Sequence, residues 1–127
     1  MPSPELTALI KTVESKFGAY KTQPNVTLIP DLYKKTGAWG ITSYTGNTPL
    51  FIEIDENLFI YNPNLGHSVT VHELLEWRAV ERGEVYPHWF SEQNTPEILK
   101  MANIRPVDVL LESWPRVRTW VFILTGH

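Results

Sequence analysis

The stretch Val71-His72-Glu73-Leu74-Leu75-Glu76-Trp77 predicts a helix with a histidine and a glutamate one turn apart on the same face. Gly83 is a suitable C-terminal stop, so this helix is expected to begin within residues 66–69 and to end at about residue 82. His72 and Glu76 lie between apolar neighbours along the helix. Both side chains are therefore expected to face the rest of the protein.

A second face of the same helix is charged and is expected to be solvated. Its residues are Arg78, Glu81 and Arg82. A carboxylate on the inward face costs free energy unless it is paired or bound to a metal. Glu76 should therefore be compensated by a divalent cation, by hydrogen-bonded water or by an arginine. The candidate arginines are Arg105, Arg116 and Arg118.

The elements around this helix predict an α+β fold in one domain covering residues 1–127. Ser3-Pro4-Glu5 begins a helix that should run over residues 4–17 and stop at Gly18. Short strands are expected over residues 25–29, 37–44 and 50–54, with a further one over 58–61. The turn at residues 45–48 indicates an antiparallel hairpin, and hence a small antiparallel sheet packed against the helix.

The C-terminal third is expected to be mostly helical. Thr95-Pro96-Glu97 predicts a new helix through Ala102, and residues 106–114 predict another. Residues 117–124 fit either a helix or a strand. The aromatic residues of this part are expected in the core, and they are Trp114, Trp120 and Phe122.

Composition excludes several classes of protein. The chain has no cysteine, so disulfides and thiolate metal sites are ruled out. A formal net charge of −3 without a basic run argues against a nucleic-acid partner. No apolar run reaches the length of about 20 residues that spans a bilayer, and the N-terminus lacks signal-peptide features. A cytoplasmic protein that does not contact the membrane is the expectation.

Residues 71–77 resemble the active-site helix of the zincin and gluzincin metallopeptidases, whose motif is His-Glu-x-x-His. The resemblance implies that His72 is a zinc ligand and that Glu73 is the base that activates zinc-bound water. Glu76 replaces the second histidine of the motif, and a carboxylate can also bind zinc. The third ligand of the family lies downstream, and His88 is the best candidate by residue type and reach.

The order of elements over residues 4–90 also resembles this family and implies a zincin-like fold. In the family an edge strand beside the active-site helix binds the peptide substrate. Residues 50–54 are the best match to that strand.

His88 lies in the aromatic segment Tyr86-Pro87-His88-Trp89-Phe90, which leaves two interpretations open. It is either the third metal ligand or a histidine that packs over the motif helix. Glu92 could replace it as a ligand if the segment is helical. His67 falls on another face of the helix and is expected at the surface, and the terminal His127 is expected to be mobile.

Two functions follow as hypotheses. The first is a small zinc-type peptidase, or another metal-dependent hydrolase, that acts on a peptide or protein with Zn²⁺, Mn²⁺ or Fe²⁺ as cofactor. The second is a catalytically inactive zincin-like module that binds another protein. Phosphoester hydrolysis at the same ligands is a weaker third interpretation. The sequence does not identify the substrate, the metal or the oligomeric state.

Overall fold

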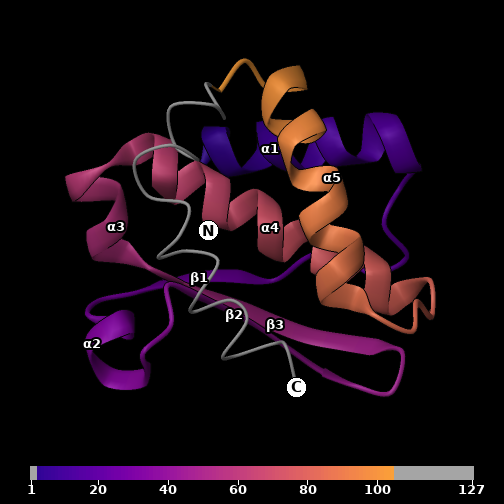
Figure 1. Cartoon of the computed structure of the whole chain (residues 1–127), viewed down its shortest axis with the longest axis horizontal. Helices are drawn as coiled ribbons and strands as arrows, with labels where there is room; N and C mark the ends of the chain where they lie inside the picture. Colours follow the sequence, from indigo (N-terminus) through magenta and orange to yellow (C-terminus); the bar gives the residue numbers. More distant parts are fainter. Residues whose placement is uncertain (1–2, 105–127) are drawn as a thin grey trace.

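A central helix, α4, organises the protein and separates a three-stranded sheet from two further helices, α1 and α5 (Figure 1). The computed structural model describes residues 3–104. The elements are α1 (Pro4–Phe17), β1 (Val26–Ile29), α2 (Leu32–Thr36), β2 (Gly40–Thr45), β3 (Thr48–Asp55), α3 (Glu56–Tyr61), α4 (Pro63–Glu81) and α5 (Pro87–Met101). The fold is therefore α+β, as predicted.

The sheet is mixed, with the order β1-β3-β2. The hairpin of β2 and β3 is antiparallel, as the turn at residues 45–48 predicted, but β1 pairs with β3 in parallel. The prediction of a purely antiparallel sheet is wrong because the segment that contains α2 carries the chain from one edge of the sheet to the other. β3, which contains residues 50–54, is consequently the central strand. The edge strand that contacts α4 is β2.

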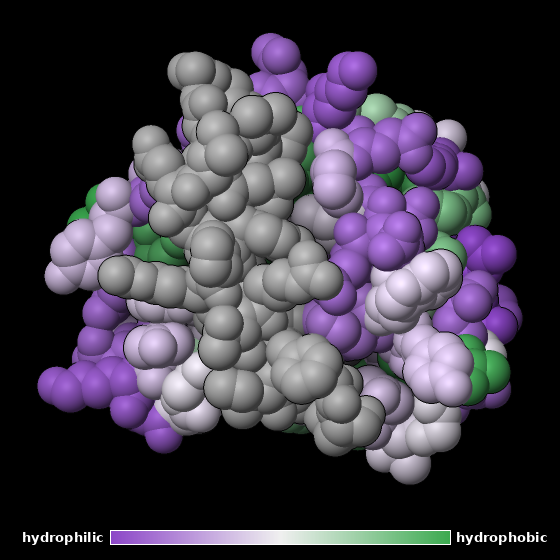
Figure 2. Space-filling model, viewed as in Figure 1, coloured by the Kyte–Doolittle hydropathy of each residue, from purple (hydrophilic) through white to green (hydrophobic). Residues whose placement is uncertain are grey.

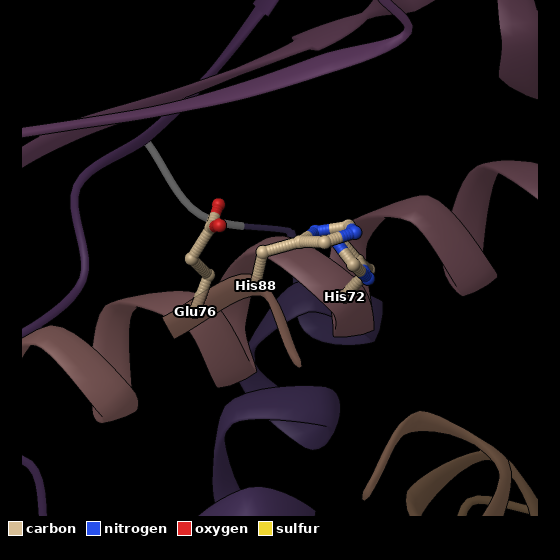
Figure 3. Close-up of side chains that lie close together, drawn as sticks. All are labelled: His72, Glu76 and His88. Atoms are coloured by element: carbon tan, nitrogen blue, oxygen red, sulfur yellow. The ribbon is translucent and has the colours of Figure 1, made fainter. Parts of the chain in front are cut away.

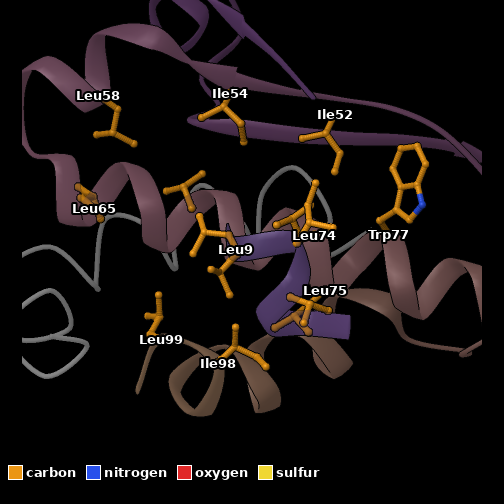
Figure 4. Close-up of a cluster of buried hydrophobic side chains, with 14 of the residues drawn as sticks. Leu9, Ile52, Ile54, Leu58, Leu65, Leu74, Leu75, Trp77, Ile98 and Leu99 are labelled. Carbon is orange, nitrogen blue, oxygen red and sulfur yellow. The ribbon is translucent and has the colours of Figure 1, made fainter. Parts of the chain in front are cut away.

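The core lies on both sides of α4. Ile52 and Ile54 of β3 cover the helix from the sheet side, and Ile98 and Leu99 of α5 cover it from the other side (Figure 4). α1 adds Leu9 and other apolar side chains to the same cluster. Every residue of α4 from Val69 to Glu81 is consequently buried.

The charged face predicted for α4 is not solvated as a whole. Arg78 is 5% exposed, donates a hydrogen bond to the Gly18 carbonyl oxygen and lies over the Tyr20 ring. Glu81 is 6% exposed and accepts hydrogen bonds from the backbone N–H groups of two residues that follow α1. Only Arg82 remains exposed. The prediction is wrong because the segment after α1, residues 18–22, packs over this face and supplies hydrogen-bond partners to Arg78 and Glu81.

Three other elements differ from the predictions. Residues 58–61 belong to α3 rather than to a strand, because Asp55 caps a helix there by accepting from the Asn57 N–H. α2 was not predicted. α5 runs through Thr95 without a break, and the Thr95 hydroxyl donates to the Ser91 carbonyl instead of capping a new helix. The elements predicted beyond residue 104, with their arginine and aromatic side chains, lie outside the described residues.

On the face shown in Figure 2 the described surface is mostly polar, and its hydrophobic residues form small separate patches. Among the described residues, no helix is both long enough and apolar enough to cross a membrane.

Candidate metal centre

The two longest helices of the described residues, α4 and α5, bring His72, Glu76 and His88 together. His72 and Glu76 lie one turn apart near the middle of α4, and His88 lies in the first turn of α5. Each of the three residues offers a ligand atom, and these atoms lie within 4.8 Å of one another. Figure 3 shows the two imidazole rings next to each other and the Glu76 carboxylate on the side of α4 that faces the strands. The tight return through residues 82–86 makes this convergence possible.

His72 is buried in contact with His88 and Ser91. Its side chain is buried, and the His88 ring lies 5.0 Å away between centroids in an edge-on arrangement. Burial, together with the neighbouring His88, lowers the pKa of His72 to about 3. Nδ1 lies 3.0 Å from the Ser91 hydroxyl oxygen, whereas the buried Nε2 has no hydrogen-bond partner among the described residues.

Glu76 is 2% exposed, and its Oε2 has no hydrogen-bond partner in the described part of the chain. Burial raises the pKa of Glu76 well above its ordinary value, and the nearby charge of Glu73 raises it further. The carboxyl groups of Glu73 and Glu76 thus share a buried environment that disfavours their ionised forms. No lysine or arginine of residues 3–104 forms an ion pair with either of them.

Glu73 is fully buried and contacts the edge strand β2. The Thr42 hydroxyl donates to Glu73 Oε1 at 2.6 Å, whereas Oε2 has no partner among the described residues. Burial raises the pKa of Glu73 to about 7, although the hydrogen bond from Thr42 opposes the rise. Gly40 leaves the space for this side chain, since a Cβ there would lie 3.0 Å from Glu73 Cγ and 3.2 Å from Oε2.

Thr42 and Gly40 were not singled out from the sequence. They share the inward face of β2, where they alternate with the half-buried Ile41 and Ser43. Nothing in the local sequence indicates that this face lies against Glu73.

The side chains present fit a divalent cation. Two histidines and one carboxylate form a donor set that binds catalytic zinc in other proteins. Buried polar atoms without partners are rare in folded proteins, and three atoms here have none within residues 3–104: His72 Nε2, Glu73 Oε2 and Glu76 Oε2. A cation bound by the three candidate ligands would remove the cost of burying the carboxylates.

The other candidates lie outside this group. Glu92 contacts His88 instead, with its Oε2 3.2 Å from His88 Nε2. His67 lies on α4 but packs edge-on against Phe59, with the ring centroids 5.6 Å apart. It is partly buried rather than fully exposed, and it lies away from the metal group as predicted. His127 is not among the described residues.

A cavity of about 620 Å³ opens between α1, β1 and the beginning of α4, away from the three ligands. It is lined by apolar side chains such as Leu6, Leu9 and Phe59, together with His67. None of His72, Glu73, Glu76 and His88 lines it.

No protein-family model, curated protein or solved structure matches this chain. What the structure supports is the group of three potential metal ligands, His72, Glu76 and His88, and not a relation to the zincins.

Proposed function

We propose that this protein is a metal-dependent hydrolase, most simply a zinc peptidase, with its centre at His72, Glu76 and His88. The observation that carries the proposal is the convergence of these three potential ligands in a buried place, next to a second buried carboxylate from Glu73. Burying such a group without a cation costs folding free energy, whereas with a bound cation the same group can serve catalysis.

Each residue has a distinct role in this proposal. His72, Glu76 and His88 would bind the cation. When bound, the cation would polarise a substrate carbonyl and acidify a water molecule. Glu73 would accept the proton of the attacking water at Oε2, because Thr42 already occupies Oε1. A carboxylate with a pKa near 7 is well suited to take up and return a proton at neutral pH.

A peptide or protein is the proposed substrate class. The support is the edge strand β2, whose Thr42 contacts the proposed base. An extended peptide can add to an open sheet edge through backbone hydrogen bonds. A nucleic-acid substrate is disfavoured by the net charge of −3. Zn²⁺ is the first choice of metal, while Mn²⁺ and Fe²⁺ suit the added carboxylate.

A second candidate function is a zincin-like binding module without catalysis. Two observations favour it. Glu76 departs from the family motif, and none of the four site residues lines the 620 Å³ cavity. In this case the cation, if bound, would serve stability only.

The test starts with elemental analysis of protein purified without a histidine tag and then supplied with Zn²⁺, Mn²⁺ or Fe²⁺. We expect about one metal ion per chain in the wild type. His72→Ala should lose the metal. His67→Ala is the matched control, because His67 lies on the same helix outside the metal group, and it should retain the metal.

Cleavage of a peptide library, followed by mass spectrometry, tests catalysis. Glu73→Gln should retain the metal but lose cleavage, because the amide is nearly isosteric and cannot accept the proton. A wild type that binds none of the three metals would contradict the metal centre. A wild type that binds metal but cleaves nothing, or a Glu73→Gln variant with full activity, would contradict the hydrolase and favour the binding module.

A further inference from the structure

We propose that Ser91 is a positioning residue that holds His72 in the tautomer with its proton on Nδ1 and its lone pair on Nε2. This inference deepens the proposed function, and its consequence for metal affinity rests on that function. The tautomer itself can be measured without any metal.

The argument begins with the single proton of the Ser91 hydroxyl. Its oxygen lies 2.6 Å from the His72 carbonyl oxygen and 3.0 Å from His72 Nδ1. A carbonyl oxygen can only accept, so the hydroxyl proton must point at it. The serine oxygen then has only lone pairs to offer to Nδ1. The contact to Nδ1 is consequently a hydrogen bond in which the ring N–H donates.

The proton at Nδ1 fixes the state of the other ring nitrogen. A histidine binds a metal as the neutral imidazole, which carries a single N–H. With that proton on Nδ1, Nε2 must present a lone pair. Nε2 is the buried ring atom without a hydrogen-bond partner among residues 3–104. A lone pair at this atom is what a metal ligand requires.

The serine is itself fixed in place. Ser91 is fully buried on α5, one turn after His88. Its backbone carbonyl accepts a hydrogen bond from the Thr95 hydroxyl at 2.7 Å. The same helix therefore supplies one ligand, His88, and orients another, His72. Partners of this kind, which hold the second ring nitrogen of a ligating histidine, fix its tautomer and orientation.

The first experiment determines the tautomer of His72 by ¹⁵N NMR in metal-free protein, with the His72 signals assigned by comparison with His72→Ala. In the wild type we expect Nδ1 to be protonated and Nε2 to be unprotonated. In Ser91→Ala this preference should be lost. A wild type with the proton on Nε2 would overturn the inference. An Nδ1 proton that persists unchanged in Ser91→Ala would overturn the role of Ser91.

The second experiment compares Zn²⁺ dissociation constants by titration against a competing chelator. Ser91→Ala should bind Zn²⁺ about 10- to 100-fold more weakly than the wild type. Thr70→Val is the matched control, because it removes another buried hydroxyl, whose hydrogen bond goes to the Gly66 carbonyl and not to His72 or Ser91. It should keep both the affinity and the His72 tautomer of the wild type.

The outcomes separate this inference from the proposed function. An equal loss of affinity in both variants would mean that Ser91 acts only through the stability of the packed helices, which would overturn the positioning role. If the wild type binds no Zn²⁺, the metal centre fails. The tautomer in the wild type and in Ser91→Ala then decides the inference alone.

Discussion

Glu73 and Glu76 show how single residues define this site. Both carboxyl groups are buried on the same part of α4, but within residues 3–104 only Glu73 accepts from a hydroxyl group, that of Thr42 in β2. That bond occupies Oε1 of Glu73, whereas Oε2 has no hydrogen-bond partner among the described residues. The bond also opposes the rise of the Glu73 pKa that burial causes. The environment of each carboxyl, rather than its residue type, therefore separates a proposed base from a proposed ligand.

Replacing Thr42 should show how much of this arrangement one hydroxyl supports. Thr42→Val keeps the shape of the side chain but leaves Glu73 Oε1 without its donor in a buried place. We expect a loss of about 1–3 kcal/mol in the free energy of unfolding, measured by urea denaturation. If the hydrolase proposal holds, cleavage should fall as well, because Glu73 is then free to rotate.

Thr70→Val is the control for this change. Thr70 is similarly buried, and its hydroxyl donates to the Gly66 carbonyl within α4 rather than to a side chain of the described site. It should cost less stability and should leave cleavage unchanged. Equal losses of stability and activity in the two variants would refute a specific role for Thr42.

At the scale of helices and strands, the carboxyl group of Asp55 connects β3, α2 and α3. Asp55 ends β3, caps α3 by accepting from the Asn57 N–H at 2.7 Å, and accepts from the Tyr33 N–H of α2 at 2.8 Å. Each oxygen thus satisfies a backbone donor that a helix start would otherwise leave unpaired. The position of α2 and the sharp change from strand to helix at residue 55 both depend on this side chain.

Asp55→Asn should therefore be destabilising even though the two side chains have the same shape. The amide offers only one acceptor oxygen and turns an N–H group toward the other backbone donor. We expect a loss of about 1–3 kcal/mol in the free energy of unfolding. Asp31→Asn is the control, since Asp31 is exposed and accepts from the Asn57 side chain. Comparable denaturation midpoints for the two variants would argue against the joining role of Asp55.

At the scale of the whole molecule, the candidate metal centre depends on the docking of α5 onto α4. His72 and Glu76 come from the central helix, whereas His88 and Ser91 come from the helix that packs across it (Figure 1). The unfolded chain cannot hold these side chains together. Any cation bound by all three ligands must therefore stabilise the folded state.

Metal should consequently raise the thermal stability of the protein. At a free Zn²⁺ concentration 100-fold above the dissociation constant, we expect about 2.7 kcal/mol of added stability and a rise in Tm of about 10 °C. Chelation with EDTA should reverse this rise. His88→Ala should abolish the response to Zn²⁺, while His67→Ala should retain it. A response that survives in His88→Ala would place the metal elsewhere.

The sequence by itself determined the elements that local signals specify. Ser3, Pro4 and Gly18 bound α1 as predicted, because capping and backbone conformation act within a few residues. The turn at residues 45–48 produced the antiparallel hairpin for the same reason. The one-turn spacing of His72 and Glu76 on the helix, with His88 a short return away, was likewise readable, and the structure brings these three residues together.

Only the tertiary structure decided the features that depend on contacts between distant segments. The parallel pairing of β1, the burial of Arg78 and Glu81, and the contact of Thr42 with Glu73 join residues that are far apart in the sequence. The continuity of α5 through Pro96 has the same origin, because α5 packs against α4 and this packing buries Ser91 and Thr95. Packing against neighbours overrides local preference at such positions. The partners of the site's side chains are therefore set by the fold, whereas the identity of its candidate ligands is set by the sequence.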